Sequence, residues 1–307
     1  MAIYHIVEMF KLKLLKHMKY SVIIPTKNNP EQVKRCIDSI PEREDIEILV
    51  CDDNSDTEYK IKIKQVCEER GNATLLASSY SAWAGHARNC GMDSAHGDWL
   101  IFSDSDDFFD AKFWESINSI TDNASADIIY FNVKGVYSDT LQPASRGEGY
   151  SKYVDDFCDG KKNAEERLRY YHMVPWGKVF RHSFIREHNL RYDEVIASND
   201  LMFNIKAGSL ATLIEAHKIL MYYVTVSNNS LTKKMDKGIL RCRYDVLIRH
   251  YKYVLSLGKP QCTYNMLQFA FRYSKPYGLS EFVYYLKKMI KNRINPFLVF
   301  YKIGRYN

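Results

Sequence analysis

The sequence predicts an α/β protein with a doubly wound, mostly parallel sheet and a helical appendage at its C-terminal end. From Tyr20 to Asp104, apolar runs typical of buried strands alternate with segments of helical spacing. This order places helices on both faces of a parallel sheet. Past residue 236 the spacing of apolar residues is helical to the end. The chain is therefore divided into a basic N-terminal extension, a main domain and a helical region, over residues 1–19, 20–235 and 236–307.

The predicted strands and helices follow in a regular order. Uninterrupted apolar residues mark strands that are buried on both faces, and four such runs are YSVIIP, IEILVCDD, ATLLAS and DWLIFSD. Helices are expected between them, over Pro30–Ile40, Glu58–Arg70 and Ala87–Ala95. Further along we expect a strand in ADIIYFNVKGVYS, a polar loop over Leu141–Lys162, a helix over Ala164–His172 and two strands in ATLIEAHKILMYYVTV.

Composition limits the class of protein. The chain has 307 residues and a hydrophobic content of 46%, enough to bury a full core. Its seven cysteines are an odd number without CxxC spacing, which argues against a disulfide framework and a zinc cluster and for a reducing compartment. The apolar runs fall short of the ~20 residues that span a bilayer, and no signal peptide is recognisable. We therefore expect a cytoplasmic protein.

The net charge of +6 is concentrated at the two ends of the chain. The basic residues there are Lys11, Lys13, Lys16 and Lys19 at one end, and Lys287, Lys288, Lys291, Arg293, Lys302 and Arg305 at the other. Basic amphipathic helices at 1–17 and 282–306 would suit peripheral contact with the cytoplasmic face of the inner membrane. A frayed extension, and a packed helix with a solvated basic face, explain the same patterns. Nucleic-acid binding is not expected, because no recognition motif accompanies the charge.

Polar clusters end three of the predicted strands, at Pro25–Asn28, Asp52–Ser55 and Asp104–Asp107. In doubly wound sheets, ligands bind outside the carboxyl ends of the strands. Asp53 is placed there to accept a hydrogen bond from a base or ribose, although an acid at this point also often caps a helix. Arg88 opens a later helix, and its guanidinium either contacts phosphate oxygens or pairs with an acid at the sheet edge.

The run Asp104-Ser105-Asp106-Asp107 is the candidate metal site. Carboxylates at alternate positions can converge on a divalent cation, Mn²⁺ or Mg²⁺, and leave positions free for substrate phosphates. Such a cation would neutralise charge on a diphosphate leaving group. A calcium loop is disfavoured, because Phe109 stands where that loop needs glycine and a strand precedes the run. A solvated acidic turn is the other interpretation of the run taken alone.

The segments SVIIPTKNN, ILVCDDNSD, AGHARNCGMDSAHGDWLIFSDSDD and SND, in this order, resemble the family 2 glycosyltransferases with the glycosyltransferase-A fold. The resemblance runs from about Tyr20 to Thr232 and is strongest to bacterial members that build cell-surface polysaccharide or lipopolysaccharide. It implies an inverting enzyme that uses a divalent cation. Its donor would be a nucleotide sugar, best a UDP-hexose or UDP-N-acetylhexosamine, and its acceptor a glycan or lipid-linked glycan.

The resemblance also implies roles for single residues. By this resemblance, Pro25, Thr26 and Lys27 would line the uracil and ribose, and Asp53 would bind the base. Arg88 and Asp104 would contact the donor, and Asp106 would bind the metal with Asp104 beside it. Asp200 would take the proton of the acceptor hydroxyl, whereas the residues alone suggest a helix N-cap. The sequence departs from the family at Lys27, which replaces a common aromatic residue, and at Asn199, which stands where a glutamate usually precedes the base.

Trp176 and Lys178 lie in a segment that resembles the part of the family near the acceptor. A tryptophan face suits a sugar ring and Lys178 could touch phosphate or acceptor, but a core tryptophan fits the pattern as well. His172 is either an auxiliary ligand or a structural residue. Two rival functions stay open. A nucleotidyltransferase would favour glycine after the first strand, and PTKNNP has none. A non-catalytic member of the family that binds nucleotide sugar or scaffolds a synthase would not need all of the acids.

Overall fold

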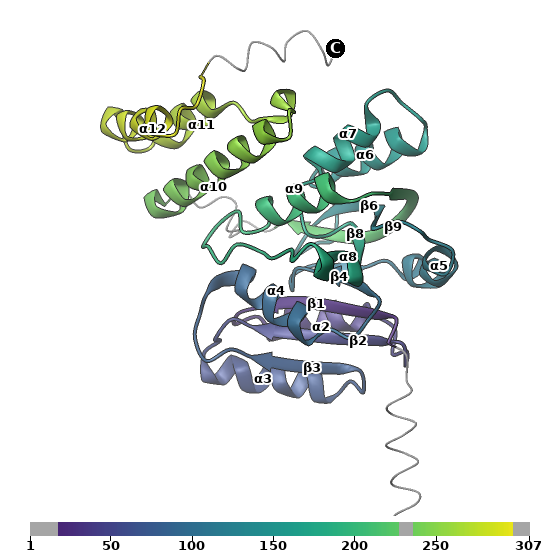
Figure 1. The fold of residues 1–307 in the computed structure, drawn as a ribbon. Helices are drawn as coiled ribbons and strands as arrows, with labels where there is room; N and C mark the ends of the chain where they lie inside the picture. Colours follow the sequence, from purple (N-terminus) through teal and green to yellow (C-terminus); the bar gives the residue numbers. More distant parts are fainter. Residues whose placement is uncertain (1–17, 227–235, 297–307) are drawn as a thin grey trace, which may run out of the picture.

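The computed structural model describes residues 18–226 and 236–296, and within them one mixed sheet forms the centre of the molecule. Its strand order is β3-β2-β1-β4-β8-β6-β9-β5, and β7 pairs with β6 (Figure 1). The strands that begin the chain are β1 (Tyr20–Thr26), β2 (Ile46–Asp52), β3 (Ala73–Ala77) and β4 (Trp99–Phe102). The later strands are β5 (Phe108–Phe109), β6 (Ile128–Tyr137), β7 (Pro143–Ala144), β8 (Lys178–Arg181) and β9 (Ile214–Val226).

The predicted parallel architecture is confirmed. β1 pairs with β2 and β4, β2 with β3, and β6 with β9, all in parallel. The antiparallel ladders of β8, β5 and β7 are short, each with two or three residue pairs. Because β8 is antiparallel to both β4 and β6, the carboxyl ends of β1, β2, β4 and β6 reach the same edge of the sheet.

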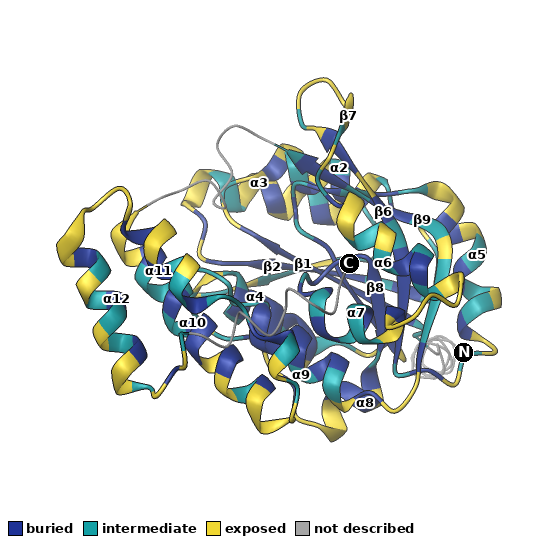
Figure 2. Cartoon of the chain, turned by 90° about the horizontal axis from the view of Figure 1, so that it is seen from above, coloured by how far each residue is buried: buried dark blue, intermediate teal, exposed yellow. Residues whose placement is uncertain are grey.

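Helices cover both faces of the sheet. One face carries α2 (Pro30–Asp38), α3 (Thr57–Glu68) and α5 (Ala111–Thr121), and the other carries α4 (Trp83–Ser94), α7 (Ala164–Tyr171), α8 (His182–Glu187) and α9 (Leu201–Leu210). In β1, Val22 and Ile24 face the first layer and Ile23 the second, and all three are fully buried. Figure 2 shows the dark blue strands between the two layers. Burial on both faces explains the continuous apolar runs of the sequence.

The helical region joins the main domain through a third core. It consists of α10 (Lys237–Ser256), a short 3₁₀ helix at Pro260–Cys262, α11 (Met266–Ser274) and α12 (Leu279–Lys291). Leu240 and Tyr244 of α10 pack in one cluster with Leu201 and Ile205 of α9. The expected helical appendage is therefore present, and it packs on the helix that follows Asp200 (Figure 1).

Two predicted elements were wrong. The expected loop over Leu141–Lys162 contains α6 (Glu148–Cys158), an eleven-residue helix. Its inner residues Tyr150, Tyr153 and Phe157 have helical spacing, which its glycine and aspartates concealed. The two strands expected after Ala211 are a single strand, β9, with a register shift opposite Asn132 of β6. No helix in the described residues is long and apolar enough to cross a membrane. The predicted amphipathic helix at 1–17 and the end of the tail lie outside the described residues.

Candidate active site

The turns after β1 and β2 are bonded to each other at the carboxyl edge of the sheet. Asn28 and Asn54 adopt positive φ values of 57° and 55°, a conformation that asparagine tolerates better than most residues. The Asn28 backbone N–H donates to Ser55 Oγ at 2.8 Å, and its side-chain amide donates to Asp56 at 3.0 Å. These hydrogen bonds hold the two turns, and the strand ends that lead into them, in place. Most of the predicted donor-site residues lie there.

Asp53 is held by the loop that leads into α4. Its carboxylate accepts hydrogen bonds from Ser81 Oγ at 2.7 Å and from the Ala82 backbone N–H at 2.8 Å. Lys27 Nζ lies 3.7 Å from the same carboxylate and donates to Ser81 at 2.9 Å. Thr26 is 4% exposed, and its hydroxyl has no hydrogen-bond partner. Pro25 lies beyond the last residue pair of the β1–β4 ladder, so its missing N–H costs that ladder no bond.

Arg88 of α4 links the acidic run to the loop before α9. Its two terminal nitrogens donate to Asp104 Oδ1 at 2.6 Å and to Asn199 Oδ1 at 2.9 Å. The guanidinium is 5% exposed and lies 5.2 Å from the ring centre of Tyr192. Of the two interpretations of Arg88, the structure shows the ion pair, and the partner is the acidic run itself.

The acids that follow Asp104 differ in their surroundings. Asp107 is 1% exposed, and its carboxylate accepts a hydrogen bond from the Thr225 backbone N–H at 2.6 Å. Asp106 uses its backbone carbonyl instead, which accepts from the Thr225 hydroxyl at 2.9 Å. Burial and the charge of Asp104 raise the pKa of Asp106, and burial and both neighbours raise the pKa of Asp107. Burial is the larger cause in both cases, and the repulsion between neighbouring carboxylates adds to it.

The donor set fits a hard cation only in part. Asp104 and Asp106 supply carboxylate oxygens, which Mn²⁺ and Mg²⁺ accept. In the described residues, no group of three His, Cys, Asp or Glu side chains is arranged to hold a metal ion. A cation here would need further oxygens from a diphosphate and from water, as is usual for Mg²⁺ in nucleotide sites.

Asp200 occupies the N-cap position of α9, but its side chain makes no capping hydrogen bond. The N-cap explanation therefore fails for the carboxylate. Burial raises its pKa, the charge of Arg88 opposes this, and the charge of Asp104 adds to it. Asp200 also contributes, after burial, to the raised pKa values of Tyr150 and Tyr264. The structure thus brings Arg88, Asp104 and Asp200 into one electrostatic neighbourhood.

The loop that carries Asp200 is held from two sides. Gly85 of α4 packs so closely on it that a Cβ atom there would lie 2.0 Å from the Asp193 carbonyl oxygen. From the helical region, Arg249 pairs with the Asp193 carboxylate at 2.8 Å. Ser198 adopts a positive φ of 56°, a conformation that serine rarely takes. The two packed helices therefore determine where Asp200 lies relative to Asp104.

This geometry agrees with a comparison against known protein families. The sequence model of glycosyl transferase family 2 matches residues 21–188, more than half of the chain. The chain belongs to that family. It is a glycosyltransferase, and the segments that suggested the resemblance lie at the edge of the sheet just described.

Individual relatives in this family are distant. The glycosyltransferase GlyA of Streptococcus pneumoniae is 22% identical over 299 residues, which cover 90% of this chain and 41% of GlyA. The poly(ribitol-phosphate) β-N-acetylglucosaminyltransferase TarS of Staphylococcus aureus is 24% identical over 216 residues, 67% of this chain and 35% of TarS. The chain thus spans well under half the length of either relative.

Solved structures share the fold. Residues 1–349 of S. aureus TarS in complex with UDP-GlcNAc superpose with a TM-score of 0.69 and 20% identity, over 90% of this chain and 81% of that one. The mannosyltransferase PcManGT of Pyrobaculum calidifontis, in complex with GDP-Man and Mn²⁺, gives a TM-score of 0.54 and 13% identity, over 94% of this chain and 84% of that one. At these identities the likeness supports the fold alone.

Two residues predicted near the acceptor of this glycosyltransferase lie in its core. Trp176 is 2% exposed, with its ring centre 5.3 Å from that of Tyr150 and 6.2 Å from that of Tyr222. Lys178 is equally buried, and its Nζ donates to the His172 carbonyl at 2.7 Å and to Asn204 at 2.9 Å. Of the two interpretations of Trp176, the structure favours the core one. Because neither side chain is open to solvent, direct contact with an acceptor does not fit this geometry.

His172 is fully buried among aromatic rings, and neither ring nitrogen has a hydrogen-bond partner. Burial and the neighbouring Lys178 hold its pKa well below the usual range. The side chain is therefore neutral and lies in the core rather than beside the acidic run. Burial likewise lowers the pKa of Lys178 far below that of a free lysine.

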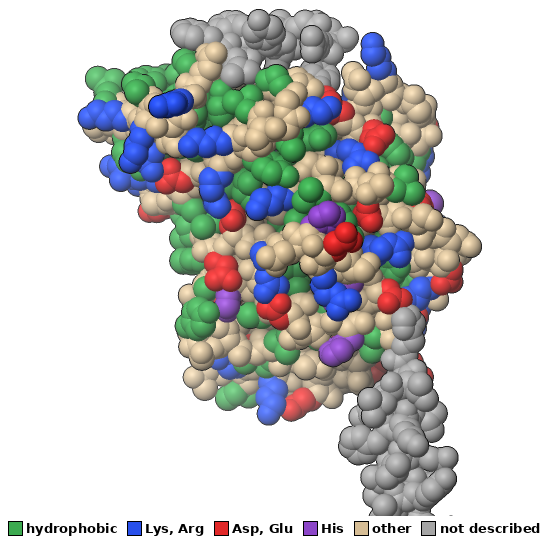
Figure 3. Space-filling model, in the orientation of Figure 1, with side chains coloured by type: hydrophobic (Ala, Val, Ile, Leu, Met, Phe, Trp, Pro, Cys, Tyr) green, Lys and Arg blue, Asp and Glu red, His purple; other side chains and the backbone are tan. Residues whose placement is uncertain are grey.

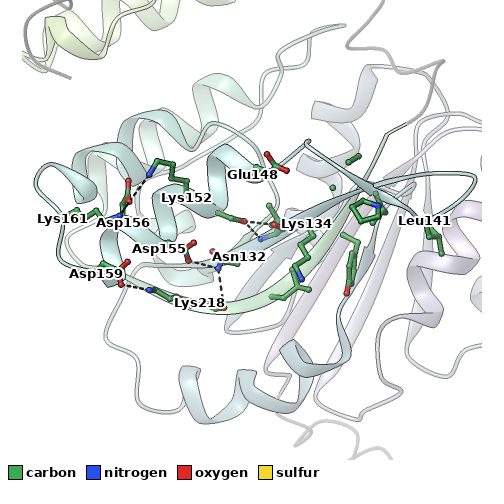
Figure 4. Close-up of a pocket in the computed structure, with 18 residues that line it drawn as sticks. Asn132, Lys134, Leu141, Glu148, Lys152, Asp155, Asp156, Asp159, Lys161 and Lys218 are labelled. Atoms are coloured by element: carbon green, nitrogen blue, oxygen red, sulfur yellow. Dashed lines mark hydrogen bonds and ion pairs between the residues drawn. The ribbon is translucent and has the colours of Figure 1, made fainter. Parts of the chain in front are cut away.

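The glycosyltransferase also has a groove of about 1030 Å³ between α6 and the carboxyl halves of β6 and β9 (Figure 4). Lysines and carboxylates alternate along it, and several pair with each other, as Lys218 does with Asp159 at 2.5 Å. Tyr223 lines one end and stacks on Phe108 at 4.8 Å between ring centres. Sequence reasoning missed this groove, because α6 was taken for a loop.

Proposed function

We propose that this glycosyltransferase inverts the configuration of a hexose or N-acetylhexosamine that it transfers from a UDP-sugar to a cell-surface glycan. The observation that carries the proposal is the placement of Asp200, free of any capping bond, beside the Arg88–Asp104 pair. A carboxylate with a raised pKa near a nucleotide-binding edge is suited to take a proton during transfer. The family supplies the reaction class, and the local geometry supports the assignment of roles.

The donor would bind at the carboxyl ends of β1, β2 and β4. Pro25, Thr26 and Lys27 would line the uracil and ribose, and the unpartnered Thr26 hydroxyl is available for a hydrogen bond. Asp53 would accept from the base. The UDP-GlcNAc complex of the TarS fragment favours a UDP-sugar here. Arg88 would act through Asp104, to which it is bonded, rather than through direct phosphate contact.

In the proposed reaction, Asp200 takes the proton from an acceptor hydroxyl while the oxygen attacks the anomeric carbon opposite the diphosphate. The bond from that carbon to the diphosphate breaks as the new glycosidic bond forms, so an α-linked donor gives a β-linked product. A Mn²⁺ or Mg²⁺ ion held by Asp106 and Asp104 would neutralise charge on the departing diphosphate. Arg88 holds Asp104 in position for that task.

The acceptor is proposed to be a saccharide chain, free or lipid-linked. The groove along α6 has a size in the range of ligand sites. Its four lysines and four acids balance in charge, which suits neutral hydroxyl-bearing ligands. Trp176 and Lys178 would contribute to acceptor binding only indirectly, because both side chains are buried in the core. The proposed setting is the cytoplasm, with peripheral contact at the inner membrane where lipid-linked acceptors reside.

A panel of UDP-glucose, UDP-galactose, UDP-GlcNAc and UDP-GalNAc with Mn²⁺ tests the proposal. Release of UDP from one donor should exceed background and should fall when EDTA replaces the metal. Asp106→Asn and Asp200→Asn should both lose this release. The alternative is a non-catalytic member that binds nucleotide sugar or scaffolds a synthase. Binding of a UDP-sugar by calorimetry without turnover, across all candidate acceptors, would establish that alternative.

A further inference from the structure

The outer face of α11 and α12 exposes large apolar side chains. Leu279 and Ile290 are 76% and 77% exposed, Phe271 is 65% exposed and Val283 is 39% exposed. On α12 these residues recur at the spacing of one helix face, opposite the buried Tyr285. Scattered apolar residues are normal on a protein surface, but a group on two adjacent helices indicates a contact surface. We call these four residues the outer apolar face.

Cations without acidic partners surround the outer apolar face. The exposed basic residues on and between these helices, and just after them, are Arg272, Lys275, Lys287, Lys291 and Arg293, and none forms an ion pair within the described residues. The one acid of this stretch, Glu281, is 1% exposed and is paired with Lys237 and Arg241. Figure 3 shows the blue and green side chains gathered over α11 and α12. The surface is therefore both apolar and positively charged.

We propose that the outer apolar face docks this protein on an anionic lipid surface. Exposed apolar side chains would enter the boundary between headgroups and acyl chains, while the surrounding cations contact the anionic headgroups. A second copy of this chain would cover the apolar residues, but it would bring the same five cations against these five. The C-terminal segment 282–306 expected from the sequence overlaps this face at Val283 and Ile290. The exposed face extends further, to Phe271 on α11 and to Leu279.

Docking at this face would orient the candidate active site. α11 and α12 pack on α10 through Tyr285 and Tyr244, whose ring centres lie 4.5 Å apart. α10 in turn packs on α9 and holds the Asp200 loop through Arg249 and Asp193. A membrane-bound helical region would therefore fix the Asp200 loop relative to the lipid surface. This consequence, access to a lipid-linked acceptor, rests on the proposed function, whereas docking itself does not.

Vesicle flotation of the full chain tests the proposal. The wild-type protein should float with vesicles that contain phosphatidylglycerol and remain at the bottom with pure phosphatidylcholine. The triple variant Phe271→Ser, Leu279→Ser, Ile290→Ser should lose flotation, and Lys287→Ser and Lys291→Ser should each lower the partition coefficient by roughly fivefold. The matched control is Ile61→Ser with Lys64→Ser on α3, where Ile61 is 54% exposed, and it should float like the wild type.

Four measurements separate this proposal from others. Circular dichroism should show unchanged melting of the triple variant, since its three side chains are largely exposed. Nucleotide release with a soluble acceptor should also be unchanged, so failure of the donor panel and failure of docking are distinct results. Flotation that persists in the triple variant would place the contact elsewhere in the chain and overturn the proposal. So would a wild-type dimer that becomes monomeric in the triple variant while flotation is unaffected.

Discussion

The two halves of the sheet differ in where their buried polar groups lie and how these groups are bonded. In the first half, over residues 20–110, Asp53 at the end of β2 is bonded to Ser81 and Ala82, whereas the buried Thr26 hydroxyl at the end of β1 has no hydrogen-bond partner. In the second half, over residues 128–226, His172 is buried without a hydrogen-bond partner and Lys178 is buried beside it. Buried polar groups of this kind cost stability. The first half therefore keeps its unfavourable polar groups at the carboxyl edge of the sheet, where the donor is proposed to bind, whereas the second half holds His172 and Lys178 in its core.

The largest expected effect comes from the second half. Asp200→Asn should lower kcat by roughly 10²- to 10⁴-fold, because the amide cannot take the proton of the acceptor hydroxyl. Affinity for the UDP-sugar, measured by calorimetry, should change little, since the proposed donor contacts lie in the first half. Asp122→Asn, at an exposed acid that follows α5, is the matched control. Equal loss of donor affinity and turnover in Asp200→Asn would erase the distinction between the halves.

Within the first half, the two acids Asp106 and Asp107 should have different roles, the first as a metal ligand and the second as a structural residue. Asp106→Asn should lower metal-dependent turnover by roughly 10²- to 10³-fold with an unchanged melting temperature. Asp107→Ala should instead lower the free energy of unfolding by about 1–3 kcal/mol, because it leaves the buried Thr225 N–H without an acceptor. Metal titrations and denaturant unfolding of both variants measure the two effects. Identical profiles would refute the division.

Arg88 connects the halves, so Arg88→Lys tests whether they act together. A lysine ammonium cannot span Asp104 and Asn199 as the guanidinium fork does. We expect kcat to fall roughly tenfold to a hundredfold as Asp104 and Asp200 shift apart, with a smaller change in KM. A rise confined to KM, with kcat unchanged, would mean that Arg88 binds the donor directly. Arg88→Gln, which keeps two hydrogen-bonding atoms without the charge, separates bridging from electrostatics.

The two halves differ in how well their secondary structure could be predicted from the sequence. The first half was predicted well, because strands such as Ile46–Asp52 are buried on both faces and appear as unbroken apolar runs. The second half was predicted less well. β9 has a register shift, and α6 hides its inner face behind glycine and aspartate. No local pattern places Asn199 against Arg88, because that contact joins residues 111 positions apart.

The same distance explains why the candidate site was predicted as a set of separate residues. Asp104 and Asp106 could be assigned from an acidic run after a strand, since the rule concerns adjacent residues. The absence of a capping bond at Asp200 could not be predicted, because it depends on how α4 and α10 hold the preceding loop. The burial of Trp176 likewise depends on rings from α6 and β9.

The smallest expected effect concerns the buried His172 of the second half. Its pKa in the folded protein lies well below that of a free histidine, so the unfolded chain binds the additional proton as pH falls below about 6.5. The free energy of unfolding should therefore decrease on acidification below that pH, by at most about 1.4 kcal/mol per pH unit for this proton. In His172→Phe that contribution disappears, and the ring still fills the space beside Tyr150.

Denaturant unfolding of His172→Phe and wild type at pH 7.5 and pH 5 measures this difference. The two proteins should be within about 1 kcal/mol of each other at pH 7.5, where the wild-type histidine is neutral in both states. At pH 5 the variant should be the more stable, because only the wild type has the contribution of His172; proton uptake at other histidines, such as His182 with its lowered pKa, affects both proteins. His96→Phe, at a histidine whose side chain is 76% exposed, is the control. If the variant lost stability in parallel with the wild type, the buried His172 would not be the source of this pH dependence.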